Sequence, residues 1–202
     1  MFSCGWGGLG QCGHGGQQDE WVPRMIESLA AERVTQVSAG EDYSVFVTEG
    51  GGALSCGWNY YGRLGQGPGV GNVTVPAAVV AEAGLVFTRA VAGSYSTLLL
   101  DSTGAAWACG GSPTHGAFTA EVGESAETPT LLPGVAGHGT VVGVALGGDH
   151  ESALLLCSDG TVLGCGYDKT HNGTVPGRLP GAALPENNNG AVALTPLPAL
   201  HR

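Results

Sequence analysis

The chain has 202 residues with 37 glycines, and its residues are 43% hydrophobic and 12% charged, a composition that can bury a core and excludes a disordered chain. The formal net charge is −10 and Lys169 is the only lysine, so the clusters of Lys and Arg that bind nucleic acid or an anionic membrane surface are missing. The sequence also lacks an apolar run of the roughly 18 to 20 residues that a membrane-spanning helix needs.

Short apolar stretches separated by turn residues predict β-strands. An acidic turn at Glu41 and Asp42 separates the first two, and glycines at 50–52 separate the second from the third, because glycine adopts a positive φ without penalty. Residues 23–33 have helical propensity, but the counterpart after Pro76 is apolar and β-branched, so we expect no long helix. The predicted strands of this unit cover residues 34–39, 43–48, 53–56 and 73–80.

Three markers recur along the chain with one period. Cys-Gly pairs begin at Cys4, Cys56, Cys109 and Cys165, which are 52, 53 and 56 residues apart. Apolar strands end at Gly40, Gly93 and Gly147, 53 and 54 residues apart, and prolines lie 53 apart at Pro23, Pro76 and Pro129. A shared period indicates tandem repeats. The predicted repeats are 1–33 (partial), 34–86, 87–140 and 141–202, the last degenerate and truncated.

The order of the markers resembles the repeat family of the regulator of chromosome condensation. Blades of that family read V-x-x-V-x-A-G-x-x-H-x-x-A-L, then a D-G turn, then W-G-x-N-x-x-G-Q-L-G-x-G; here VTQVSAGEDYSVFV and GWNYYGRLGQG match the two ends. The resemblance covers nearly the whole chain and weakens after Gly110. It implies an all-β fold, a β-propeller whose ring is incomplete at three to four blades.

Rings of this family usually contain seven blades. This chain has four copies of the Cys-Gly pair, which marks the third strand of a blade, and three copies of the glycine that ends the first strand. We prefer the explanation that the chain is a fragment of a longer propeller. Two further explanations stay open, namely that two chains complete one ring and that a partner caps the array.

Catalytic, cofactor and metal motifs are missing from the sequence. Cys4, Cys12 and His14 give C-x7-C-x-H without the C-x2-C pair of structural zinc sites. The glycines at 57 and 62 have phosphate-loop spacing, but Arg63 and Leu64 replace the required Lys-Ser/Thr. We therefore expect no catalytic residue, no cofactor and no metal, and we predict that the repeated cysteines are small buried side chains in strands. Tryptophans expected to fill space in or between blades are Trp6, Trp58 and Trp107.

The resemblance also points to a binding surface. In family members that act as guanine-nucleotide exchange factors, acidic and histidine residues of the A-G-x-x-H turn face the GTPase. The partner-binding positions implied here are Glu41, Asp42, Tyr43, Ser94, Tyr95, Asp149 and His150. Tyr43 and Ser96 stand where the histidine would be in the first two turns. For His150 the alternative is a hydrogen bond that ties its own turn to a neighbouring strand.

The sequence thus predicts a non-enzymatic protein-interaction scaffold that regulates a small GTPase as an exchange factor. The alternative is a regulatory propeller fragment of a larger enzyme such as a ubiquitin ligase or a kinase. The expected partner is a protein, with self-association as a way to complete the ring, and neither nucleic acid nor a membrane. Six cysteines without a visible secretory signal favour an intracellular location, which we expect to be cytoplasmic rather than nuclear.

Overall fold

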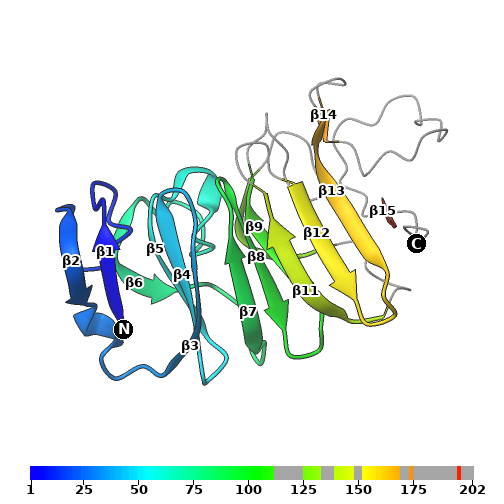
Figure 1. The fold of residues 1–202 in the computed structure, drawn as a ribbon, viewed down its shortest axis with the longest axis horizontal. Coiled ribbons are helices and arrows are strands. Elements are labelled where there is room, and N and C mark those ends of the chain that lie inside the picture. The colour runs from blue at the N-terminus through cyan, green and yellow to red at the C-terminus, as the bar shows by residue number, and fades with distance from the viewer. Residues whose placement is uncertain (112–124, 133–138, 148–151, 169–172, 175–194, 197–202) are drawn as a thin grey trace.

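The computed structural model describes residues 1–111, 125–132, 139–147, 152–168, 173–174 and 195–196. These residues form antiparallel sheets that stand side by side in chain order (Figure 1). Each sheet is a blade, so the predicted all-β propeller with an incomplete ring is confirmed.

Blade 1 contains two strands and blade 2 contains four. In blade 1, β1 (Phe2–Gly5) pairs with β2 (Glu20–Met25). In blade 2 the strand order follows the chain: β3 (Val34–Ala39), β4 (Tyr43–Thr48), β5 (Ala53–Gly57) and β6 (Val73–Ala78). The strands predicted for this unit are therefore confirmed, the first two to the residue. A short 3-10 helix η1 (Glu27–Leu29) follows β2, and no long helix forms in residues 23–33.

Blades 3 and 4 repeat the arrangement. Blade 3 contains β7 (Phe87–Ala92), β8 (Ser96–Asp101), β9 (Ala106–Gly110) and β10 (Ala126–Leu131). Blade 4 contains β11 (Val141–Leu146), β12 (Ser152–Cys157), β13 (Val162–Asp168) and the two-residue strands β14 (Gly173–Thr174) and β15 (Thr195–Pro196). The first strands of blades 2, 3 and 4 contact one another in order, which places β3, β7 and β11 on the same side of the array.

The hydrophobic core lies between the blades rather than within one of them. Side chains alternate across β4, so Phe46 packs towards Ile26 of blade 1 while Val45 and Val47 pack towards blade 3. The next cluster joins blade 3 to blade 4, and Leu98 and Leu155 in it are completely buried. Burial on both faces explains why β4 and β8 are largely apolar along their length, whereas β12 of blade 4 is buried on one face only.

The glycine loops connect neighbouring blades. The loop of residues 7–15 passes so close to β6 that a Cβ at Gly10 would lie 2.8 Å from the Thr74 Cα. One repeat later, a Cβ at Gly62 would lie 2.6 Å from the Glu127 Cα of β10. Backbone amides then donate to the same strands, Gly15 to the Thr74 carbonyl at 2.8 Å and Gly67 to the Glu127 carbonyl at 2.9 Å. Glycine recurs in these loops because the backbone of each loop packs directly against the fourth strand of the next blade.

The packing predictions hold for blades 2 and 3 and fail for blade 1. Cys56 and Cys109 are buried, as predicted, but Cys4 is exposed. Trp107 packs against the cluster between blades 2 and 3, whereas Trp6 is 56% exposed, so the expectation for Trp6 is wrong. In the described chain β1 is paired on one edge only, and no strand equivalent to β4 covers Cys4 or Trp6. The side chain of Cys165 lies outside the described residues.

Candidate protein-interaction surface

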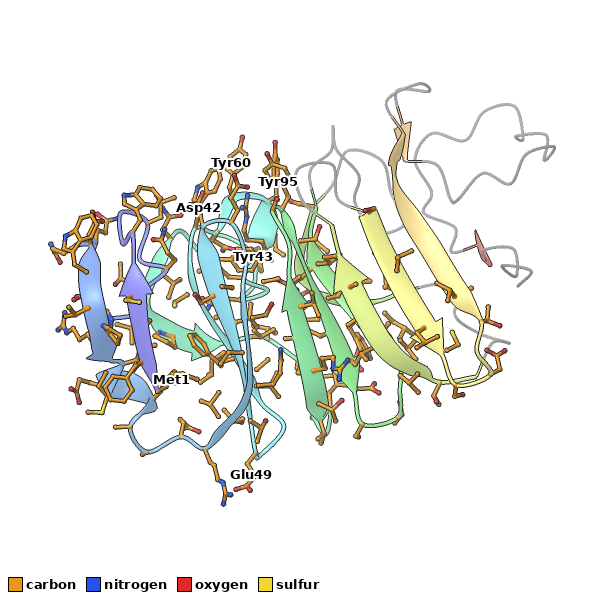
Figure 2. The ribbon with its side chains drawn as sticks, in the orientation of Figure 1. Met1, Asp42, Tyr43, Glu49, Tyr60 and Tyr95 are labelled. Carbon is orange, nitrogen blue, oxygen red and sulfur yellow. The ribbon has the colours of Figure 1, made fainter. Side chains whose placement is uncertain are left out.

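Turns and glycine loops from blades 2 and 3 meet at one end of the sheets. Figure 2 shows Asp42, Tyr60 and Tyr95 at this end and Glu49 at the opposite one. We call this end the loop face and define it by Glu41, Asp42, Trp58, Tyr60, Tyr61, Ser94 and Tyr95. A rigid array of sheets carries these short loops, which is a common arrangement for binding sites.

Five of the residues predicted to bind a partner lie within the described chain, and they differ in exposure. Glu41 is exposed, and Asp42 and Tyr95 are half-buried, so these three present side chains to solvent. Ser94 is 7% exposed and Tyr43 only 1% exposed. Asp149 and His150 lie outside the described residues.

Tyr43 joins two blades. Its hydroxyl donates to the Ser96 carbonyl at 2.6 Å and accepts from the Gly93 amide at 3.0 Å. Both partners belong to blade 3, whereas Tyr43 begins β4 of blade 2. A buried hydroxyl needs such partners, because an unmet hydrogen bond in the interior costs about 1–3 kcal/mol. Tyr43 therefore offers no side-chain surface to a partner.

The structure corrects the alignment of the last turn. The Gly40 amide donates to the Tyr43 carbonyl and the Gly93 amide to the Ser96 carbonyl. The Gly147 amide donates instead to the Ser152 carbonyl, so Ser152 takes the place that the sequence pattern assigned to His150. Residues 148–151 between them lie outside the described residues, so the prediction for Asp149 and His150 stays a prediction.

Arg63 lies beneath the loop face and is completely buried. Its Nε donates to the Tyr60 carbonyl at 2.8 Å, and one terminal nitrogen donates to the Ser94 carbonyl of the next blade. The guanidinium carbon lies 4.3 Å from the ring centroid of Trp58 and 5.2 Å from that of Tyr95. The planar guanidinium suits stacking on rings while it donates in the plane. Arg63 stands where the family pattern has glutamine, and no sequence motif indicates its role.

Four aromatic rings form a connected row above Arg63, which we call the ring ladder. Trp58 and Tyr60 stack with centroids 5.2 Å apart, Tyr60 and Tyr61 lie 4.1 Å apart, and Tyr61 meets Tyr95 edge-on at 6.1 Å. Tyr60 is 52% exposed. A hydrogen bond with Tyr61 raises the pKa of Tyr60 above its ordinary value of 10.0. Tyr60 and Tyr61 were not among the residues predicted to bind a partner, although adjacent tyrosines in a glycine loop were the signal.

A cavity of about 340 Å³ lies between blade 1 and blade 2. Apolar groups make up much of its wall, including Phe2 and Trp6 on one side and Val37 and Phe46 on the other. It adjoins the unpaired edge of β1. In blade 2 the equivalent strand β5 pairs on both edges, with β4 and with β6.

The described residues contain no group of three or more His, Cys, Asp or Glu that is placed to hold a metal ion. Ser3 and His14 form a pair with 2.9 Å between Oγ and Nε2, but the Ser3 hydroxyl donates to the Cys12 carbonyl at 2.6 Å. With its proton engaged there, Ser3 is not arranged as an activated nucleophile. No helix in the described part of the chain is long and apolar enough to span a bilayer.

Comparisons with known proteins agree with this architecture. The model of the "Regulator of chromosome condensation (RCC1) repeat" matches residues 1–47 and 50–100, and a second RCC1 repeat model matches residues 34–63. The human "Inhibitor of Bruton tyrosine kinase" is 34% identical over 101 residues, which cover 49% of this chain and 8% of that protein. The human "E3 ubiquitin-protein ligase HERC2" is 30% identical over 153 residues, 76% of this chain and 3% of that protein.

Solved structures share the fold over most of the chain. Human WBSCR16 aligns with a TM-score of 0.73 at 23% identity, covering 98% of this chain and 47% of its own. Prp20p of Saccharomyces cerevisiae aligns with a TM-score of 0.68 at 18% identity, covering 87% and 46%. The chain thus spans less than a tenth of the two curated relatives and about half of these two structures. Its first hundred residues are regulator of chromosome condensation (RCC1) repeats, and the chain belongs to that repeat family.

Proposed function

We propose that the chain is a non-enzymatic interaction scaffold whose loop face binds a protein partner. The exposed Tyr60 at the same end of the molecule as the acidic Asp42, on loops held by buried contacts between blades, is the observation that supports this most strongly. Aromatic residues on a rigid frame are typical centres of protein interfaces because they bury a large area at little entropic cost. The partner-binding residues that we propose on this face are Glu41, Asp42, Ser94 and Tyr95, with Asp149 and His150 from the following turn.

Site-specific photo-cross-linking tests this proposal. A benzophenone amino acid in place of Tyr95 is expected to yield protein adducts in a cell extract, whereas the same group in place of Glu49, at the opposite end, yields none. Equal labelling from both positions, or none from position 95, would contradict the proposal.

The sharper form of the proposal is that the partner is a small GTPase and the chain accelerates nucleotide release. Prp20p, a structural neighbour, is described as binding Gsp1p and histones. Release of a fluorescent nucleotide from a panel of small GTPases is the direct assay. We expect at least one GTPase to release nucleotide ten or more times faster, with the effect reduced by Asp42→Asn and kept in Glu49→Gln. Release at the buffer rate across the panel would sink the exchange hypothesis.

The second candidate is a regulatory propeller of a larger enzyme, cytoplasmic in location. HERC2, a relative over 76% of this chain, is described as a ubiquitin-protein ligase and is many times longer. The coding sequence on either side of this chain tests this candidate, since an adjacent catalytic domain would favour it and further blades alone would contradict it.

We also propose self-association through the open ends of the array. The unpaired edge of β1 lies at one end, and Leu154 and Leu156 are 47% and 43% exposed at the other. Sedimentation is expected to give twice the chain mass of 20.2 kDa, and a monomer at every concentration would overturn this proposal.

A further inference from the structure

We propose that the ring ladder of Trp58, Tyr60, Tyr61 and Tyr95 is a preformed site for an arginine-bearing, positively charged protein segment. Tyr60 is its central contact, and Glu41 and Asp42 supply the opposite charge. This inference rests on the proposed function, because it names the chemistry of the partner that the loop face binds.

The ladder joins two blades into one continuous surface. Trp58, Tyr60 and Tyr61 come from the loop after β5, and Tyr95 comes from the turn between β7 and β8. Figure 2 shows Tyr60 and Tyr95 projecting from the same end of the molecule. With neighbouring centroids 4.1 to 6.1 Å apart, the rings leave no room for side chains between them. A partner therefore meets a wall of aromatic faces and edges rather than separate tyrosines.

The ladder is held from below before any partner arrives. Arg63 is buried under Trp58 and Tyr95 and donates to carbonyls of both loops, so the loops cannot move independently without breaking these contacts. Tyr61 has a φ of 62°, and it is the one non-glycine residue in the described ranges with a positive φ. A tyrosine in that conformation costs of order 1 kcal/mol, and such strain clusters at functional sites. Rigid rings lose little entropy on binding, which favours affinity.

The charges around the ladder favour a cationic partner. Glu41 is exposed and Asp42 half-buried in the adjoining turn, and the Asp42 carbonyl accepts from the Trp58 amide at 2.9 Å, which places the acidic turn against the ladder. Arg63, the cation that lies beneath the loop face, is completely buried. The whole chain carries a net charge of −10. Complementary charge of this kind selects partners and speeds their encounter.

Arginine fits the site better than lysine does. Its flat guanidinium stacks on an aromatic face, as Arg63 itself does on Trp58, and still donates in its plane to a carboxylate. Tyr60, which is 52% exposed, offers the aromatic ring, and Asp42 or Glu41 offers the carboxylate. A lysine ammonium is a compact, strongly hydrated charge that gains less from a flat ring.

A labelled peptide of four Arg-Gly units is the probe, compared with the same peptide containing lysine or citrulline. Citrulline keeps the shape of arginine but has no charge. Fluorescence anisotropy at low salt is expected to show binding in the order arginine, lysine, citrulline. Tyr60→Ala should weaken arginine-peptide binding about fivefold or more, Tyr60→Phe should restore it because the ring remains, and Asp42→Asn should weaken it about threefold.

Trp21→Ala is the matched control, since Trp21 is 88% exposed on β2 of blade 1 and is not part of the ring ladder, and it should leave binding unchanged. Circular dichroism confirms that each variant folds. Equal binding of the arginine and citrulline peptides, or unchanged binding in Tyr60→Ala, would overturn the inference. If cross-links form from position 95 while the arginine peptide does not bind, the interaction surface stands and its cationic specificity is wrong. If the peptide binds through Tyr60 while position 95 captures no protein, the specificity stands and the scaffold function is wrong.

Discussion

The two aligned glycine loops, residues 3–15 in blade 1 and 55–67 in blade 2, follow the same path in different surroundings. The Ser3 hydroxyl donates to the Cys12 carbonyl at 2.6 Å, and one repeat later the Ser55 hydroxyl donates to the Leu64 carbonyl at 2.7 Å. Each loop also donates to the fourth strand of the next blade. What the loops bury is different, because β1 pairs on one edge and β5 on both.

The comparison shows that residues within the loop set its path, whereas neighbouring strands set the burial of its side chains. Arg63 sharpens the point. Its counterpart in the first loop is Gln11, whose side-chain oxygen accepts locally from the Leu9 amide at 3.0 Å. Arg63 instead reaches across to blade 3 and stacks against rings of both blades. The side chain at this position bonds within its own loop in one copy and links two blades in the other.

The largest expected difference between the loops is thiol reactivity. Burial raises the pKa of Cys56 to about 12, from an ordinary value of 9.0, and Cys109 is raised to about 12 by the same cause. Since the thiolate is the nucleophile, the reactive fraction at pH 8 falls by about a thousandfold. Iodoacetamide should therefore modify the exposed Cys4 at least about 100 times faster than Cys56, as followed by peptide mass spectrometry. Similar rates at the two cysteines would mean that β4 does not protect the second loop.

The next largest effect is a loss of stability where a glycine loop packs against the next blade. Gly62→Ala places a methyl group 2.6 Å from the Glu127 Cα at a φ of 72°, so we expect a loss of about 3 kcal/mol in the free energy of unfolding. Gly69→Ala, with a φ of 76° but nothing within 4 Å, should lose about 1 kcal/mol. Urea denaturation measures both. Equal losses would show that the close approach to β10 does not require glycine.

Replacing Arg63 with glutamine, the residue at the matching position of the first loop, tests directly whether its side chain links the blades. Arg63→Gln removes the donor to the Ser94 carbonyl and the stacking against Trp58 and Tyr95, and should cost about 2 kcal/mol. Arg24→Gln removes an exposed pair with Glu20 and should cost less than about 0.5 kcal/mol. Thermal unfolding of the two variants is the measurement. A cost for Arg63→Gln as small as that for Arg24→Gln would contradict its role between blades.

The smallest expected effect is a pH-dependent loss of stability at the turn after β8, compared with the matching turn after β4. Burial opposes ionisation of Asp101, but hydrogen bonds from Thr103, Trp107 and the backbone outweigh it and lower the pKa of Asp101 below its ordinary 3.8. The ionised form therefore stabilises the fold above about pH 4, and this contribution is lost as the pH falls through the lowered pKa. Asp101→Asn should cost about 1–2 kcal/mol at pH 7 and little at pH 2.5. Thr48→Ala, at the matching position of blade 2, should cost less than about 0.5 kcal/mol at either pH. A loss for Asp101→Asn that does not vary with pH would contradict the role of its charge.

The fold was largely predictable because its signals are local. Residues 34–39 and 43–48 are short stretches rich in apolar and β-branched residues that end at turn residues, and the predicted strands match β3 and β4. The candidate surface was predictable in part. Glu41, Asp42 and Tyr95 present side chains to solvent at the loop face, whereas Tyr43 points inward to blade 3. Asp149 and His150 lie outside the described residues. Tyr60 was missed because a glycine loop does not reveal which of its side chains the next blade covers.

The sequence by itself determined the repeat, its period of about 53 residues, the strands and the positions of the turns. Those features depend on side-chain alternation and on backbone preferences that act within a few residues. Only the tertiary structure decided that Cys4 is exposed and Cys56 buried, that Arg63 links two blades and that four rings meet at one end. These outcomes depend on which strand of another repeat lies beside each side chain, and contacts across 50 or more residues leave no local pattern.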